Sequence, residues 1–123
     1  MLFVRHDIKI KCKDNKELNA HKEVLAKHSD LLKKNFEENE NIEVIDMTEF
    51  DSKIVKEMLL FIYRGKITDI ERNFLPLLRL AKMFRIGLLE EFCSEEYTKV
   101  AYINTYVPLN QLNPKVEELD LDG

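Results

Sequence analysis

The three histidines are the side chains of this sequence best suited to acid–base or metal chemistry. They are His6, His21 and His28. Histidine titrates near neutral pH and also binds metal ions, so each one is a candidate general base or ligand. A helix running through both His21 and His28 would place them, seven residues apart, on roughly the same face. That spacing admits a metal pair, although no third ligand lies next to either residue.

The other side chains form no recognisable catalytic arrangement. Serine occurs only at Ser29, Ser52 and Ser94, and none lies in the glycine-flanked elbow of a serine nucleophile. The three glycines are too far apart in sequence to build a phosphate-binding loop. Acidic pairs such as Glu37-Glu38 and Glu90-Glu91 are better explained as outward helix faces than as a paired acid and base. We therefore predict that the chain is not an enzyme, with no catalytic residue, metal or cofactor.

The two cysteines, Cys12 and Cys93, are predicted to be core residues. They lie far apart, and no close second cysteine or histidine completes a zinc site. Both fall at apolar positions of their expected elements. We interpret them as small core hydrophobes in a reducing compartment.

Composition indicates a single globular domain without nucleic-acid or membrane partners. The chain has 123 residues, of which 45% are hydrophobic and 34% charged. Its net charge of −4 argues against non-specific binding of nucleic acid, because such binding needs clustered cations. The longest apolar run, residues 58–62, is far shorter than the roughly 20 residues of a membrane-spanning helix. No signal peptide is visible because Met1 to Val4 give way at once to charged residues. We expect a cytoplasmic or nuclear location.

Lysines 9, 11, 13 and 16 form a local basic patch near the start of the chain. The alternation of lysine with apolar residues over residues 8–13 predicts a half-buried strand, with these lysines on its solvent face. Asp14-Asn15 then supplies turn chemistry, and residues 17–20 are expected to return as the second strand of a hairpin. The β-branched residues of 42–45 favour a further strand.

Helical spacing of apolar residues indicates the remaining elements. Val24 and Leu25 mark the buried side of a short helix, and Ser29 is a good N-cap for the next one. We expect Leu25, Leu59 and Leu78, each on a different helix, to share one core.

Two longer helices are expected in the second half of the sequence. The first is capped by Asp51 or Ser52 and ends at Gly65, which accepts the left-handed conformation. The second spans 73 to about 84, where Pro76 is tolerated because it falls in the first turn.

The amino-acid composition changes near the end of the sequence. Gly87 is expected to break the chain before a last helix, and after about residue 103 the apolar density falls and acidic residues outnumber the one cation, Lys115. We interpret residues 104–123 as a solvated tail or as a docking peptide. The side chains that would dock are Tyr106, Leu109, Leu112 and Leu119.

Several of these segments together resemble a known family. Residues 21–29, read as His-Lys-Glu-Val-Leu-Ala-Lys-His-Ser, resemble the signature of a BTB/POZ domain. Residues 7–10 and 17–20 look like the strands that precede it, and residues 61–65, Phe-Ile-Tyr-Arg-Gly, look like its helix-ending motif. Residues 77–81, followed by Leu88 and Cys93, are similar to its last two helices. The order and spacing agree from about residue 6 to residue 100.

The resemblance implies an α/β (α+β) fold that binds proteins. It predicts a small sheet from segments near residues 7–12, 17–20 and 42–46, packed against a cluster of about five short helices. Together with the change in composition near residue 103, it leads us to assign residues 1–103 to the domain and 104–123 to the tail. It also makes His21 a structural residue whose ring nitrogens satisfy nearby backbone groups.

The family further points to candidate interface residues. Asp7 and Lys22 match an acidic and a basic position that form a charged pocket near the dimer interface; an ordinary exposed ion pair is the alternative. Leu2, Phe3 and Val4 are apolar and precede the first family strand. At a sheet edge they would pair with another chain, although a plain start to the first strand explains them equally well.

Cullin-recruiting members of the family carry a hydrophobic-x-glutamate motif just after the second helix. Phe36-Glu37-Glu38 satisfies it literally, which makes Phe36 and Glu38 candidate cullin contacts, yet Phe36 also matches a core phenylalanine of that helix. The resemblance implies homo- or hetero-oligomerisation and partner recruitment, as a cullin-type ubiquitin ligase adaptor. The alternative is a scaffold unrelated to ubiquitin, in a chromatin or RNA-regulatory assembly.

Overall fold

The first half of the chain folds into a three-stranded sheet. The computed structural model describes the backbone of residues 5–112 and the side chains of residues 5–99. The strands are β1 (Ile8–Cys12), β2 (Glu17–Ala20) and β3 (Val44–Met47), in the order β2-β1-β3. β1 pairs antiparallel with β2 and parallel with β3. Asn15 takes a positive φ of 64° at the hairpin turn, as its short polar side chain permits.

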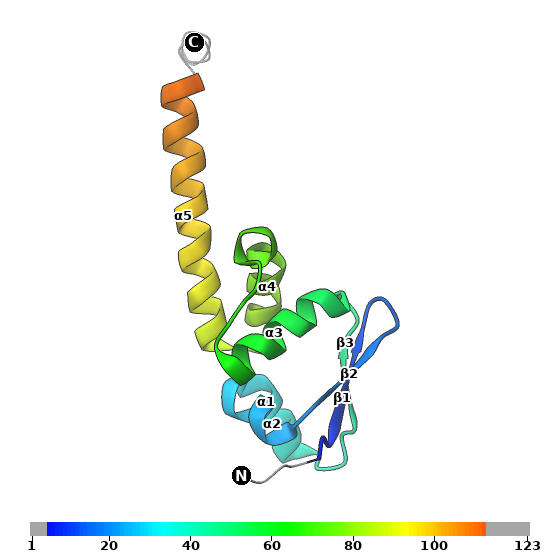
Figure 1. The fold of residues 1–123 in the computed structure, drawn as a ribbon. Helices are drawn as coiled ribbons and strands as arrows, with labels where there is room; N and C mark the ends of the chain where they lie inside the picture. Colours follow the sequence, from blue (N-terminus) through cyan, green and yellow to red (C-terminus); the bar gives the residue numbers. More distant parts are fainter. Residues whose placement is uncertain (1–4, 113–123) are drawn as a thin grey trace.

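Five helices are described in residues 5–112: α1 (Lys22–His28), α2 (Asp30–Glu38), α3 (Ser52–Arg64), α4 (Ile70–Phe84) and α5 (Gly87–Leu112). They lie on one side of the sheet, and α5 extends well beyond α4 (Figure 1). β1 turns Ile8, Ile10 and Cys12 toward the helices and leaves Lys9 and Lys11 exposed. The expected α+β fold and the alternation of the first strand are confirmed, whereas the third strand spans Val44–Met47 instead of the expected residues 42–45.

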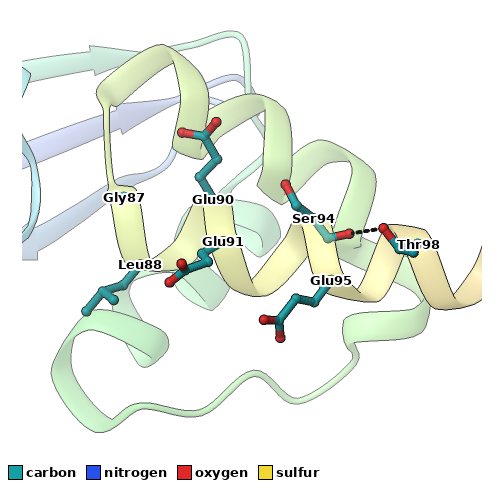
Figure 2. A pocket seen from close by; sticks show the side chains of 7 residues that line it. All are labelled: Gly87, Leu88, Glu90, Glu91, Ser94, Glu95 and Thr98. Atoms are coloured by element: carbon teal, nitrogen blue, oxygen red, sulfur yellow. Dashed lines mark hydrogen bonds between the residues drawn. The ribbon is translucent and has the colours of Figure 1, made fainter.

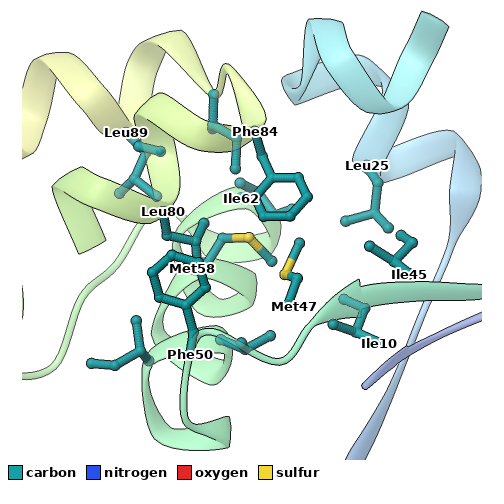
Figure 3. Close-up of a cluster of buried hydrophobic side chains, with 14 of the residues drawn as sticks. Ile10, Leu25, Ile45, Met47, Phe50, Met58, Ile62, Leu80, Phe84 and Leu89 are labelled. Atoms are coloured by element: carbon teal, nitrogen blue, oxygen red, sulfur yellow. The ribbon is translucent and has the colours of Figure 1, made fainter. Parts of the chain in front are cut away.

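One hydrophobic core joins the sheet to all five helices (Figure 3). Leu25, Met58 and Leu77 are at most 1% exposed, so each helix they represent contributes a fully enclosed side chain. Leu59 and Leu78, which were expected to share one core with Leu25, pack against that core but are only partly buried. Both cysteines are buried and free, as predicted.

Helix ends follow the expected chemistry in some places and not in others. Ser29 caps α2, and Gly65, at φ 72°, ends α3 in the left-handed conformation. The expected start of α4 at residue 73 is wrong, because Asp69 accepts a hydrogen bond from the Arg72 amide and the helix begins at residue 70. Pro76 therefore lies inside the helix rather than in its first turn.

The break before the last helix is made by Arg85 rather than by Gly87. Arg85 has a φ of 56°, whereas Gly87 is the first residue of α5. This helix runs for 26 residues and continues through Pro108 to Leu112, so the predicted domain boundary near residue 103 falls inside it. The separation of residues 104–123 from the domain stays a prediction, and residues 113–123 lie outside the described part of the chain.

Candidate protein-interaction surface

Asp7 fixes the chain that leads into β1 to the start of α1. Its Oδ1 accepts a hydrogen bond from the backbone N–H of Lys22 at 2.8 Å. A carboxylate is favoured there because the first amides of a helix have no intrahelical partner and carry partial positive charge. The two residues expected to meet therefore do meet, through the Lys22 backbone. Among the ion pairs described for residues 5–99, none joins their side chains.

The Lys22 side chain turns toward α2 instead. Its Nζ donates to the Glu40 carbonyl at 3.0 Å and stands 5.8 Å from the centroid of the Phe36 ring. The cation and the ring face attract each other at that separation. The predicted charged pocket is thus a carboxylate held by a backbone amide, beside a lysine that covers Phe36.

Phe36 and Glu38, the candidate cullin contacts, lie in the last turn of α2 and differ in exposure. Phe36 is partly buried and packs against the hydrophobic core, whereas Glu38 is exposed. Phe36 therefore fills the place of a core phenylalanine, one of the two interpretations open from the sequence.

β3 is an edge strand. It pairs with β1 on one side, and no strand of residues 5–112 pairs with its other side. Val44 stands on the solvent face of this strand and is 48% exposed. Beside it is a surface hollow of about 520 Å³, to which His6, Asp7 and Glu43 also contribute. An open edge with an exposed β-branched residue is a template for pairing with another strand.

The remaining candidate interface residues lie where the structure gives no side chains. Leu2, Phe3 and Val4 fall outside the described residues. Tyr106, Leu109 and Leu112 lie on the last turns of α5, of which only the backbone is described, and Leu119 lies beyond it.

His21 is tied to α3 by Tyr63. The tyrosine hydroxyl accepts from the His21 backbone N–H at 2.9 Å and lies 2.8 Å from the imidazole Nδ1. This contact supports the structural interpretation of His21, with a side-chain hydroxyl as its described partner. No group of three or more metal-ligating side chains occurs among the described residues.

A further hollow of about 730 Å³ lies along the first turns of α5 (Figure 2). It is lined by Glu90, Glu91 and Glu95 together with Ser94 and Leu88. Within this hollow the Thr98 hydroxyl donates a hydrogen bond to the Ser94 backbone carbonyl at 3.0 Å, one turn earlier in the helix. This bond does not involve the Ser94 hydroxyl and so does not activate it as a nucleophile.

Burial keeps both thiols in their neutral form. It raises the pKa of Cys12, and it raises the pKa of Cys93 to about 11. A thiol that stays protonated at neutral pH is a poor nucleophile, so these cysteines act as packing residues.

Sequence reasoning missed the half-exposed Val44 at the edge of the sheet. The strand itself was expected, but its place at the edge depends on β1 pairing with two partners. The signal was the alternation of exposed Val44 and Asp46 with buried Ile45 and Met47, which marks a strand with one solvent face.

No helix of the described residues is long and apolar enough to cross a membrane.

Comparisons with known proteins agree with this architecture. Residues 3–100 match the family described as BTB/POZ domain. Kelch-like protein 38 of Danio rerio is 33% identical over an alignment 89 residues long, which covers 69% of this chain and 15% of that protein. The chain thus spans about 15% of the length of this curated relative.

Two solved structures share the fold. The BTB domain of zebrafish PATZ1 superposes with a TM-score of 0.67 at 24% identity, over 76% of each chain. The BTB domain of human gigaxonin superposes with a TM-score of 0.63 at 21% identity, over 72% of this chain and 75% of that one. From the sequence match and the shared fold together, this chain belongs to the BTB/POZ domain family of protein–protein interaction modules.

Proposed function

We propose that this domain assembles with a second copy of itself, or with a related BTB/POZ chain, through the open edge of β3. The observation that carries the proposal is that edge, which has no partner strand in residues 5–112 and presents Val44 at 48% exposure. Strand addition at such an edge satisfies backbone groups and removes apolar surface from water.

The occupant we propose is the apolar segment Leu2-Phe3-Val4 of the partner chain. In sequence only Arg5 separates it from His6 and Asp7, which line the same hollow as Val44. Asp7 is fixed by the Lys22 amide and shares the hollow with Glu43 and Val44, so the segment starts from a defined point near the beginning of β3. A two-fold arrangement would then place the segment of each chain on β3 of the other.

Sedimentation velocity at tens of micromolar tests this assembly. Val44→Lys places a charge on the edge and should give a monomer. Leu75→Lys is the matched control, since Leu75 is 54% exposed on α4, away from the sheet. We expect the parent and Leu75→Lys to sediment as dimers. A monomeric parent, or a Val44→Lys variant that still dimerises, would overturn the proposal.

Recruitment of a cullin is the second candidate, and the exposure of Glu38 at the end of α2 favours it. The geometry supports it less well than edge pairing, because Phe36 packs against the core and lies beneath Lys22. A pull-down with a cullin amino-terminal domain decides the matter. Glu38→Lys should abolish binding, while Glu37→Lys, the same charge change one residue away, should keep it. Absence of binding by the parent would leave the non-ubiquitin scaffold as the role of this domain.

A further inference from the structure

A basic groove runs along the exposed side of α3. It consists of two adjoining surface hollows, of about 560 Å³ and about 310 Å³, which share Lys56 and Leu60 in their linings. The larger one reaches the turn of the β1–β2 hairpin, and the smaller one reaches Asn19 on β2, the other edge strand of the sheet. The groove therefore lies on a different surface from β3.

Four cations line this groove: Lys16, Lys53, Lys56 and Arg64. None of them takes part in the ion pairs described for residues 5–99. The sequence as a whole is acidic, with a net charge of −4, so a cluster of cations that lack an ion-pair partner is a local departure from the rest of the chain.

The two carboxylates in the lining are already engaged in hydrogen bonds. Asp14 accepts from the Ser52 amide at 3.0 Å and from the Ser52 hydroxyl at 2.6 Å. Glu57, only 8% exposed, accepts from the amide and the hydroxyl of Thr68. Glu57 is thus held within the fold, whereas Asp14 stays exposed, so four cations face one exposed carboxylate and the net exposed charge of the groove is positive.

The floor between the cations is apolar. Leu59 and Leu60 are partly buried, and Tyr63 is 40% exposed. An occupant that matches this surface carries carboxylates alternating with aliphatic side chains. Such a peptide pairs with the rim by charge and buries its apolar groups on the floor.

We propose that this groove binds the acidic segment of a second copy of this chain, residues 113–123. Residues 116–122 read Val-Glu-Glu-Leu-Asp-Leu-Asp, four carboxylates interleaved with aliphatic residues. Four acidic residues face four cations in the groove. α5 leads away from the body that contains α3 as far as Leu112, which favours a second copy over the same molecule as the source of the segment (Figure 1). The contact is independent of pairing at β3.

Fluorescence anisotropy with a labelled peptide of residues 113–123 tests the proposal on the full chain. We expect saturable binding that weakens as salt is raised. Lys53→Glu/Lys56→Glu should weaken it about tenfold or more, because exposed charge pairs are each worth a few-fold in affinity. Lys16→Glu, on the hairpin turn, should weaken it as well. Lys33→Glu/Lys34→Glu is the matched control, because it makes the same charge change on exposed residues of α2.

The peptide provides a second test. Replacing its Leu119 and Leu121 with alanine should lower affinity several-fold while leaving its charge unchanged. Equal loss of binding in the α2 control would mean that attraction to net charge alone was measured, and it would overturn the proposal. So would full-strength binding by the Lys53/Lys56 variant with an unchanged circular dichroism spectrum. Because the peptide is added in trans, its failure to bind leaves dimerisation through β3 unaffected.

Discussion

Ser29 joins two helices through one buried hydroxyl, and its removal should be unusually costly for a serine. The side chain is 1% exposed. Its Oγ accepts from the Leu32 amide at 3.0 Å, which caps α2, and it donates to the carbonyl of Phe84 at the end of α4. Ser29→Ala removes both bonds at once.

The magnitude follows from adding the two losses. Loss of an N-cap costs about 1 kcal/mol, and leaving a buried carbonyl without its donor costs about 1 to 3 kcal/mol. We therefore expect Ser29→Ala to lower the free energy of unfolding by about 2 to 4 kcal/mol. Asp69→Ala is the control, because Asp69 caps α4 through one hydrogen bond of 3.3 Å from a half-exposed side chain and should cost only about 0.5 to 1 kcal/mol.

Urea unfolding followed by circular dichroism at one protein concentration measures both changes, since the chain has no tryptophan. The midpoint should fall with an unchanged slope. Equal losses for the two variants would show that the bond from Ser29 to Phe84 contributes nothing, and the reasoning about a shared hydroxyl would be refuted.

Three further predictions concern the stability of the fold. Leu25→Ala and Leu77→Ala should each cost about 2 to 5 kcal/mol in the same urea assay, while Leu59→Ala, at a partly buried site, should cost clearly less; equal losses would contradict the burial described here. Burial raises the pKa of Cys93 from 9.0 to about 11, so this thiol ionises at lower pH in the unfolded chain than in the folded one. Its contribution to stability should be full below about pH 9 and fall as the pH rises toward 11. A Cys93→Ala variant that shows the same fall would contradict this. Tyr63→Phe should lower the free energy of unfolding by about 0.5 to 1.5 kcal/mol, because it removes the acceptor of the His21 amide. If His21 is structural, a chelator should leave the melting temperature of the parent unchanged, and stoichiometric zinc in purified protein would refute that role.

Elements with strong local signals could be predicted from the sequence. The alternation of apolar residues with lysine over residues 8–13 indicated β1, and Ser29 and Gly65 marked helix ends. These signals could be recognised because each depends only on neighbours in the chain. The family resemblance placed the same elements in the same order. The start of α4 was missed because Pro76 was taken to mark a first turn, whereas the Asp69 cap decides it. α5 continues past Pro108, against the local preference of proline.

The surfaces could be predicted only in part. Asp7 and Lys22 were expected to meet, but the sequence does not reveal that the Lys22 backbone makes the bond while its side chain covers Phe36. The basic groove combines residues from a hairpin, from α3 and from the loop that follows α3. Such a surface exists only after these segments pack, and no local pattern in the sequence encodes it.

Backbone hydrogen exchange at β3, measured at low and high protein concentration, tests the central claim of edge assembly most directly. Lys9 stands opposite Val44 and donates to the Glu43 carbonyl, so the parallel ladder turns the amides of Val44 and Asp46 toward the open edge and that of Ile45 toward β1. We predict that Val44 and Asp46 exchange quickly in dilute protein and slowly at tens of micromolar, while Ile45 is protected at both. Exchange at Val44 and Asp46 that stays fast in a sample shown to be dimeric would contradict assembly through this edge.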